Sequence, residues 1–214
     1  MPAPLLECIR NRRSVFPRHY HPNKRVSRAV MQRLLEAAMW APYHGSVPPW
    51  RFVVLGRKAI VEMQHLTLSY YDENWRKAGW ANGKVGQPEK YFAWRQRIEN
   101  EIHTRWKSVS YMVAIIMRRQ AGSKRMPEWE EAAATACAVQ NMHLQASTQP
   151  DLACYWSSWH AAARDSSMMS KFLNMKVEDK CLGFFIVAHC APNSKTGCGV
   201  VRTPEKHLAT EWRD

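Results

Sequence analysis

Two adjacent arginines and a serine, Arg12-Arg13-Ser14, form the first cluster in the sequence that could do chemistry. They lie at the end of a short expected helix, residues 5–13. Two guanidinium groups and a hydroxyl at a helix end can hold a phosphate and the polar edge of a ring. Adjacent arginines are more often a solvated face, and the residues alone leave that alternative open.

A loop rich in proline and glycine, residues 43–49, carries the second candidate, His44. Loops of this composition are rigid and can place backbone groups beside a ligand. His44 could donate a hydrogen bond to an anion or a carbonyl, and no second histidine is spaced to form a metal pair with it. The alternative is a turn residue in contact with solvent.

The third candidate is the segment Tyr155-Trp156-Ser157-Ser158-Trp159-His160, at the end of a short apolar strand. Ligands often lie at the carboxyl end of strands in open sheets. Two indole rings that flank two serines offer stacking walls together with hydroxyl and amide donors. The alternative is an aromatic core strand that runs into a polar turn.

The charge of the chain points to anionic partners. Lysine and arginine total 31 against 18 acidic residues, so the formal charge is +13. Such a surplus attracts nucleic acid, acidic membranes or phosphorylated cofactors, and charge alone does not choose among them. The basic residues are spread along the chain and no known nucleic-acid motif appears, which makes nucleic acid an unfavoured partner. Ten tryptophans suit the walls of a pocket for a flat ligand.

Length and composition predict one globular domain, residues 1–214. The six cysteines are scattered without a C-x-x-C pair, so we expect neither a metal site nor a disulfide framework, although Cys190 and Cys198 could pair under oxidation. No stretch is long and apolar enough to span a bilayer, and residues 1–13 lack the apolar run of a signal peptide. We therefore expect a cytoplasmic protein that does not bind membranes.

Helices and strands that could position these residues alternate along the chain. Ser27 is the expected N-cap of a helix that ends before Ala41-Pro42. Residues 69–88 lose the apolar pattern and contain three glycines, which suggests a mobile loop. From residue 192 the tail is irregular and basic. One sheet in an α+β or α/β domain is expected. Further helices are predicted at 58–68, 89–107, 127–147 and 166–173, and strands at 52–55, 109–117, 152–156 and 182–188.

Taken together, these clusters resemble the nitroreductase family. The resemblance covers most of the chain except residues 69–107, and it looks closest to the short bacterial members. Each motif is modest, but their order and spacing are fairly specific. They are Arg12-Arg13-Ser14, a helix ending at Ala41-Pro42, the His44 loop with Pro49-Trp50-Arg51-Phe52, the strand segment from Glu178 to Phe185, and the tail around Arg202-Thr203-Pro204.

The resemblance implies an α+β fold with a central mixed or antiparallel sheet flanked by helices, and a homodimer with two FMN molecules at the subunit interface. Arg12, Arg13 and Ser14 would hold the phosphate, the ribityl chain or the pyrimidine edge. Arg202 would add phosphate charge from the tail. Trp40 and His44 would reach FMN from the other subunit. Trp156, Ser157 and Ser158 would line the isoalloxazine ring.

The implied activity is hydride transfer from NADH or NADPH through FMN to a nitroaromatic, a quinone or a similar small acceptor, with no catalytic acid or base from the protein. Residues 69–107 form an insert relative to the short members and are expected to cover the substrate face. The sequence departs from the family in three places. Val47-Pro48 replaces Asn and Gln, Ala153-Cys154 replaces a Gly-Gly pair, and Ser157 stands where short members often have Arg.

Three alternatives remain at this point. The same fold could serve a reductive dehalogenase or a flavin-modifying enzyme, with the insert as a lid. A flavin-binding protein without turnover is a second. A basic nucleic-acid-binding module that uses aromatic stacking is the third.

Overall fold

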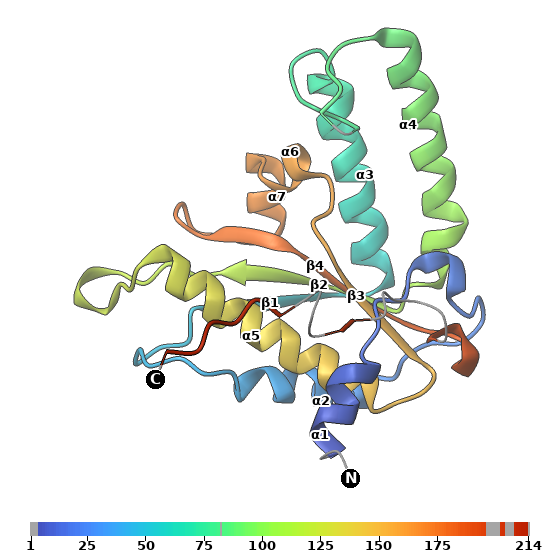
Figure 1. Ribbon diagram of the computed structural model, residues 1–214. Coiled ribbons are helices and arrows are strands. Elements are labelled where there is room, and N and C mark those ends of the chain that lie inside the picture. Colours follow the sequence, from blue (N-terminus) through green and yellow to red (C-terminus); the bar gives the residue numbers. More distant parts are fainter. Residues whose placement is uncertain (1–3, 82, 196–201, 204–207, 214) are drawn as a thin grey trace.

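A computed structural model describes residues 4–81, 83–195, 202–203 and 208–213 (Figure 1). Its secondary structure alternates helices and strands in the predicted order. The helices are α1 (Pro4–Asn11), α2 (Arg28–Met39), α3 (Arg57–Asn74), α4 (Pro88–His103), α5 (Glu128–Ser147), α6 (Ala161–Arg164) and α7 (Ser167–Phe172). The strands are β1 (Trp50–Leu55), β2 (Tyr111–Met117), β3 (Leu152–Ser157) and β4 (Lys180–His189). Short 3₁₀ helices are η1 (Pro17–His19), η2 (Arg105–Ser108), η3 (Gly122–Lys124) and η4 (Pro192–Lys195).

The four strands form one sheet in the order β1-β2-β4-β3. Every neighbouring pair is antiparallel, which confirms the α+β fold and selects the antiparallel alternative of the expected sheet. The two central strands are apolar on both faces because both faces are covered, so their sequences read as continuous apolar runs. β3 is an edge strand, and the loop that follows α1 lies along its free side.

Helices cover both faces of the sheet (Figure 1). α2 and α5 pack on one face, where Val113 and Phe185 belong to the core. α3 and α7 pack on the other, where Met112 and Phe184 belong to a second core. Neighbouring residues of β2 and β4 divide between these cores because successive strand side chains point to opposite faces. The predicted cap is confirmed, since the Ser27 hydroxyl accepts a hydrogen bond from the Val30 amide.

The expected loop over residues 69–88 is shorter in the structure, because its first six residues belong to α3 and Pro88 begins α4. α3 continues to Asn74, and with α4 it forms a long hairpin that projects from the sheet (Figure 1). The connection is anchored by rings, because Trp75 stacks on Tyr91 with centroids 5.1 Å apart and Trp80 is buried. Aromatic packing between the two helices therefore replaces the local apolar pattern that the sequence lacks. α4 also ends earlier than predicted, and η2 follows it.

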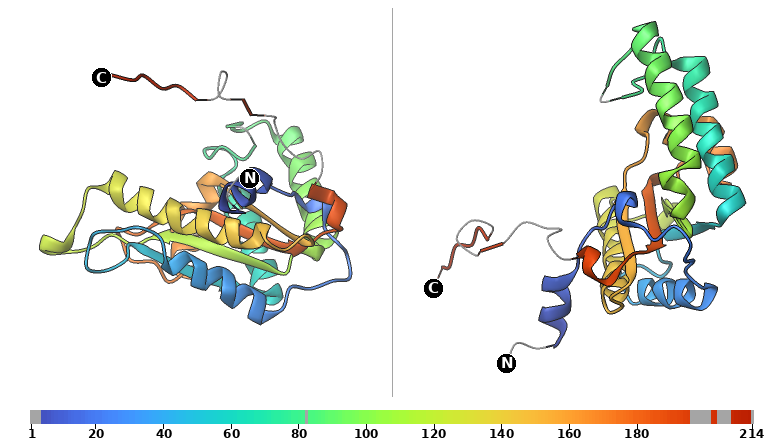
Figure 2. Two further views of the ribbon diagram at one scale, coloured as in Figure 1. Left: turned by 60° about the horizontal axis from the view of Figure 1, so that its bottom comes forward. Right: turned by 90° about the vertical axis from the view of Figure 1, so that its right-hand side faces the viewer.

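The final described segment, residues 208–213, lies away from the sheet and helices (Figure 2). Its Trp212 side chain is 87% exposed. Cys198, which could pair with Cys190, and Pro204 of the tail motif lie outside the described residues. Cys190 itself is buried.

Candidate flavin site beside the edge strand

The loop after α1 is fastened along β3, which places Arg12, Arg13 and Ser14 at the edge of the sheet. The Val15 amide donates to the Cys154 carbonyl at 3.1 Å. Val15 is fully buried, and its own carbonyl accepts from the Tyr20 hydroxyl at 2.9 Å. A buried apolar residue with both backbone groups bonded fixes the position of the polar residues just before it.

Three arginines share this edge. The pKa of Arg12 is lowered, first because the guanidinium is partly buried and then because Arg202 and Arg13 are close and positively charged. In the described part of the chain, none of the three forms an ion pair with a carboxylate. A group of cations that repel one another without a local counter-charge is suited to an anion such as a phosphate.

His143 of α5 ties this loop to the helix, and sequence reasoning missed it. Its Nε2 lies 3.1 Å from the Arg13 carbonyl and its Nδ1 lies 3.5 Å from the Arg12 guanidinium. The ring packs edge-on against Phe185. A histidine on the buried face of a predicted helix, four residues after Val139, was the only local signal. The Arg13 guanidinium turns back instead to donate to the Arg10 and Arg12 carbonyls.

A hollow opens between β3 and α5, next to His143. It has a volume of about 390 Å³ and is lined by Trp156, His143, Cys137 and Gln140 among others. The Trp156 side chain is 38% exposed, and its indole donates to the Leu182 carbonyl at 3.0 Å, which fixes the ring. A fixed, half-exposed indole beside a cation cluster offers a flat ligand one apolar wall and one charged end.

A bulge in β4 holds the end of β3 in place. The register with β2 shifts around Leu182, so the Leu182 carbonyl is free to accept from Trp156. Gly183 follows with φ of +125°, a region that disfavours residues with a Cβ. A Cβ built at this position would lie 2.3 Å from the Ser157 carbonyl oxygen. Glycine at position 183 therefore permits the close approach of Ser157.

The turn after β3 is strained and anchored by hydrogen bonds. Trp159 has φ of +58°, which is rare for a bulky residue. Its amide donates to the Ser157 hydroxyl at 3.1 Å, and its indole donates to the Thr67 hydroxyl of α3 at 3.0 Å. Ser158 is exposed, and its carbonyl accepts from Arg164. The Ser157 hydroxyl thus orders the turn, and Ser158 presents its side chain to solvent.

Trp40 and His44 are not brought to this cluster within one chain. Trp40 caps α2, is 81% exposed and lines a separate groove with Leu5 of α1. His44 pairs with Glu130 at 2.9 Å near the start of α5. Glu130 and His143 are separated along α5 by a rise of about 20 Å at 1.5 Å per residue. In one chain, Trp40, His44 and Trp156 therefore line three different hollows along α5.

Comparison with known proteins agrees with this architecture. Residues 9–189 match the model of the nitroreductase family, and this range contains all four strands of the sheet. The chain belongs to the nitroreductase family. This confirms the resemblance inferred from the motifs, and it places the protein in a family of oxidoreductases. No curated protein is detectably similar to the chain.

Solved structures of nitroreductase-family proteins share the fold at low sequence identity. A nitroreductase-like family protein from Bacillus cereus is 22% identical, with a TM-score of 0.69 over 99% of this chain and 98% of that one. A nitroreductase with bound FMN from Bacteroides fragilis is 19% identical, with a TM-score of 0.67 over 99% and 100%. The FMN-dependent nitroreductase NfnB from Mycobacterium smegmatis, in complex with NADPH, is 15% identical, with a TM-score of 0.67 over 98% of both chains.

Two further observations concern the described residues. No helix there is long and apolar enough to cross a membrane. No group of three or more His, Cys, Asp or Glu residues in that part of the chain could hold a metal ion.

Proposed function

We propose that this nitroreductase-family chain binds FMN and catalyses electron transfer from NADH or NADPH to a small acceptor such as a nitroaromatic or a quinone. The observation that carries the proposal is the cation cluster of Arg12, Arg13 and Arg202 beside the hollow lined by Trp156. A phosphate and a flat ring joined by a flexible chain match one charged end and one aromatic wall.

The residues at the β3 edge fit FMN chemically. Arg12 and Arg202 supply positive charge with no bound carboxylate among the described residues, so a phosphate would relieve their mutual repulsion. Ser14 is half-buried next to them and offers a hydroxyl to the ribityl chain. Arg13 could also contribute to phosphate binding if its guanidinium leaves the carbonyls at the end of α1.

The end of β3 would hold the ring. The Trp156 indole gives an apolar wall, and the backbone of Ser157 and Ser158 gives donors and acceptors for polar ring edges. When bound, FMN supplies two-electron transfer between NADH or NADPH and a second substrate. The protein contributes position and electrostatics, so we expect no catalytic acid or base. The exposed end of β3 leaves room for a nicotinamide and an acceptor to occupy the same place in turn.

The functional unit we propose is a homodimer. Trp40 and His44 line hollows separate from the one beside Trp156, so their predicted contact with the flavin would come from a second subunit. Apolar side chains on α1 and at the end of α2 support this assembly, since Leu5 is 65% exposed and Met39 is 69% exposed. Exposed apolar residues gathered near one groove are typical of an interface.

The visible absorbance spectrum of the purified protein tests the proposal directly. We expect a yellow protein whose flavin absorbance bleaches when NADH or NADPH is added without oxygen. An acceptor screen with nitroaromatics and quinones would then regenerate the colour. A colourless protein that takes up no added FMN would refute the proposal, and salt-sensitive DNA binding by such a protein would favour the nucleic-acid alternative.

Replacement of both Arg12 and Arg13 by Ala tests the site assignment. The double variant should fold but lose FMN during gel filtration, because two of the phosphate-facing cations are gone. Loss of one charged hydrogen bond costs about 1.5–3 kcal/mol, so the dissociation constant should rise at least tenfold. Arg28→Ala, which removes an exposed cation at the start of α2, is the matched control. Unchanged flavin occupancy in the double variant would remove the assignment.

A further inference from the structure

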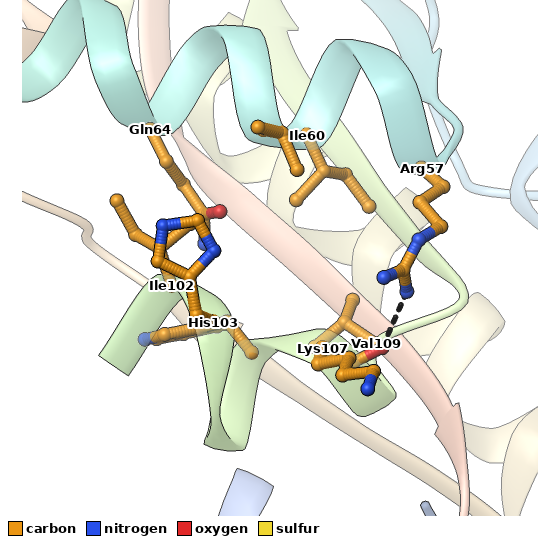
Figure 3. Close-up of a pocket in the computed structure, with 9 residues that line it drawn as sticks. Arg57, Ile60, Gln64, Ile102, His103, Lys107 and Val109 are labelled. Atoms are coloured by element: carbon orange, nitrogen blue, oxygen red, sulfur yellow. Dashed lines mark hydrogen bonds between the residues drawn. The ribbon is translucent and has the colours of Figure 1, made fainter. Parts of the chain in front are cut away.

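A second cavity lies on the other side of the molecule, between α3 and the chain that leads from α4 into β2 (Figure 3). Its volume is about 330 Å³, at the lower end of the range for small-molecule sites. α3 follows β1, and β1 is the edge strand opposite β3. The cavity therefore shares no residue with the arginine cluster or with the Trp156 hollow.

The floor of this cavity is apolar except for one amide. Ile60, Ile102 and Val109 are buried, each at most 4% exposed. Gln64 is 2% exposed and lines the same floor, and its side-chain nitrogen has no hydrogen-bond partner. A buried amide without a partner costs free energy, so such groups in folded proteins are usually satisfied by water or a ligand. The unpaired Gln64 donor calls for an acceptor inside the cavity.

The mouth of the cavity is cationic. Arg57 and Lys107 stand at the end opposite Gln64 and His103, with Ile60 between them (Figure 3). The Arg57 guanidinium donates to the Lys107 carbonyl at 2.8 Å, which leaves its other N–H groups for a ligand. Arg25 donates to the same carbonyl at 2.9 Å and adds a third positive charge. The lining contains no aspartate or glutamate.

We propose that this cavity binds a small carboxylate with a compact aromatic or apolar body and a hydrogen-bond acceptor at its far end. The carboxylate would meet Arg57 and Lys107, where bidentate pairing with a guanidinium is strong. The body would pack on Ile60, Ile102 and Val109. The acceptor would meet the Gln64 amide, with His103 beside it. A para-substituted hydroxybenzoate has this order of groups.

Binding of 4-hydroxybenzoate to the purified protein, measured by isothermal titration calorimetry in the presence of excess FMN, tests the proposal. Benzoate lacks the distal acceptor and 4-hydroxybenzamide lacks the charge, so both should bind more weakly. Gln64→Leu should weaken 4-hydroxybenzoate about tenfold and leave benzoate nearly unchanged. Arg57→Met should weaken both carboxylates about tenfold, and Lys58→Met, at the exposed neighbouring position, should weaken neither.

Two results would overturn the proposal. One is the absence of binding by either carboxylate at millimolar concentration, when Gln64→Leu and the parent protein melt as folded proteins. The other is binding that neither Gln64→Leu nor Arg57→Met alters, because the ligand would then occupy another site. Added FMN keeps the β3 edge occupied if the proposed function holds. If no flavin binds, carboxylate binding still reports on this cavity through the two variants.

Discussion

Gly183→Ala is the substitution that most directly tests how the fold shapes the candidate flavin site. Gly183 follows the β4 bulge, and its φ of +125° is a conformation that other residues adopt only with strain. A methyl group there would also lie 2.3 Å from the Ser157 carbonyl and 2.8 Å from the Trp156 indole nitrogen. The variant therefore strains the β4 backbone and pushes on the two β3 residues expected to face the flavin.

The expected loss of stability is the sum of the backbone strain at position 183 and the steric overlap of the added methyl group. The backbone conformation costs about 1–3 kcal/mol for a residue with a Cβ. Overpacking against a backbone atom costs a further 1–3 kcal/mol or so, because neither strand can move far in a buried sheet. The sum is about 4 kcal/mol. At about 2–4 °C per kcal/mol for a domain of this size, the melting temperature should fall by roughly 8–16 °C.

Thermal unfolding followed by circular dichroism, together with flavin occupancy, measures both consequences. We expect Gly183→Ala to melt earlier and to retain less FMN, because Ser157 must move. Gly56→Ala is the control, since nothing lies within 4 Å of a Cβ there and its φ of −84° is ordinary. Its melting temperature should fall much less, by the equivalent of about 1 kcal/mol, because alanine is a poorer N-cap than glycine at the start of α3. A Gly183→Ala protein that melts with the parent and binds FMN equally well would refute the reasoning.

Two further substitutions probe a buried charge and a partly buried histidine. Glu131 is fully buried, where it pairs with Arg119 and accepts a hydrogen bond from the Met126 amide. Glu131→Ala should therefore lower the free energy of unfolding, measured in urea, by about 3–5 kcal/mol. A loss no greater than that of a surface substitution would contradict the buried pairing. Burial lowers the pKa of His160 from 6.5 to about 4, so the unfolded chain takes up this proton first. Stability from this group is complete above about pH 6.5 and falls by about 3 kcal/mol as the pH drops toward 4. His160→Phe should flatten that part of the pH–stability curve, and an unchanged curve would show that other groups control it.

Local patterns in the sequence predicted most of the secondary structure correctly. The Ser27 cap, the run of apolar residues in β2 and the acidic first turn of α5 after Pro127 depend on neighbours within a few residues. The ordered motifs that carry the family resemblance are also local, and the family match over residues 9–189 confirms the resemblance itself. These features could be predicted because the interactions that determine them lie within one helix or one strand.

The assembly of the candidate site was decided by tertiary structure. The loop after α1 lies along β3, Arg202 reaches Arg12 from the tail, and His143 contacts the loop from α5. The α3–α4 hairpin is joined by stacked rings such as Trp75 and Tyr91, which lie in different elements of the chain. Each of these contacts joins residues from different elements, and no local propensity records which elements will meet. The sequence by itself determined the elements and the chemistry they carry. Packing decided which of those groups share one surface, because that depends on the shape of the whole core.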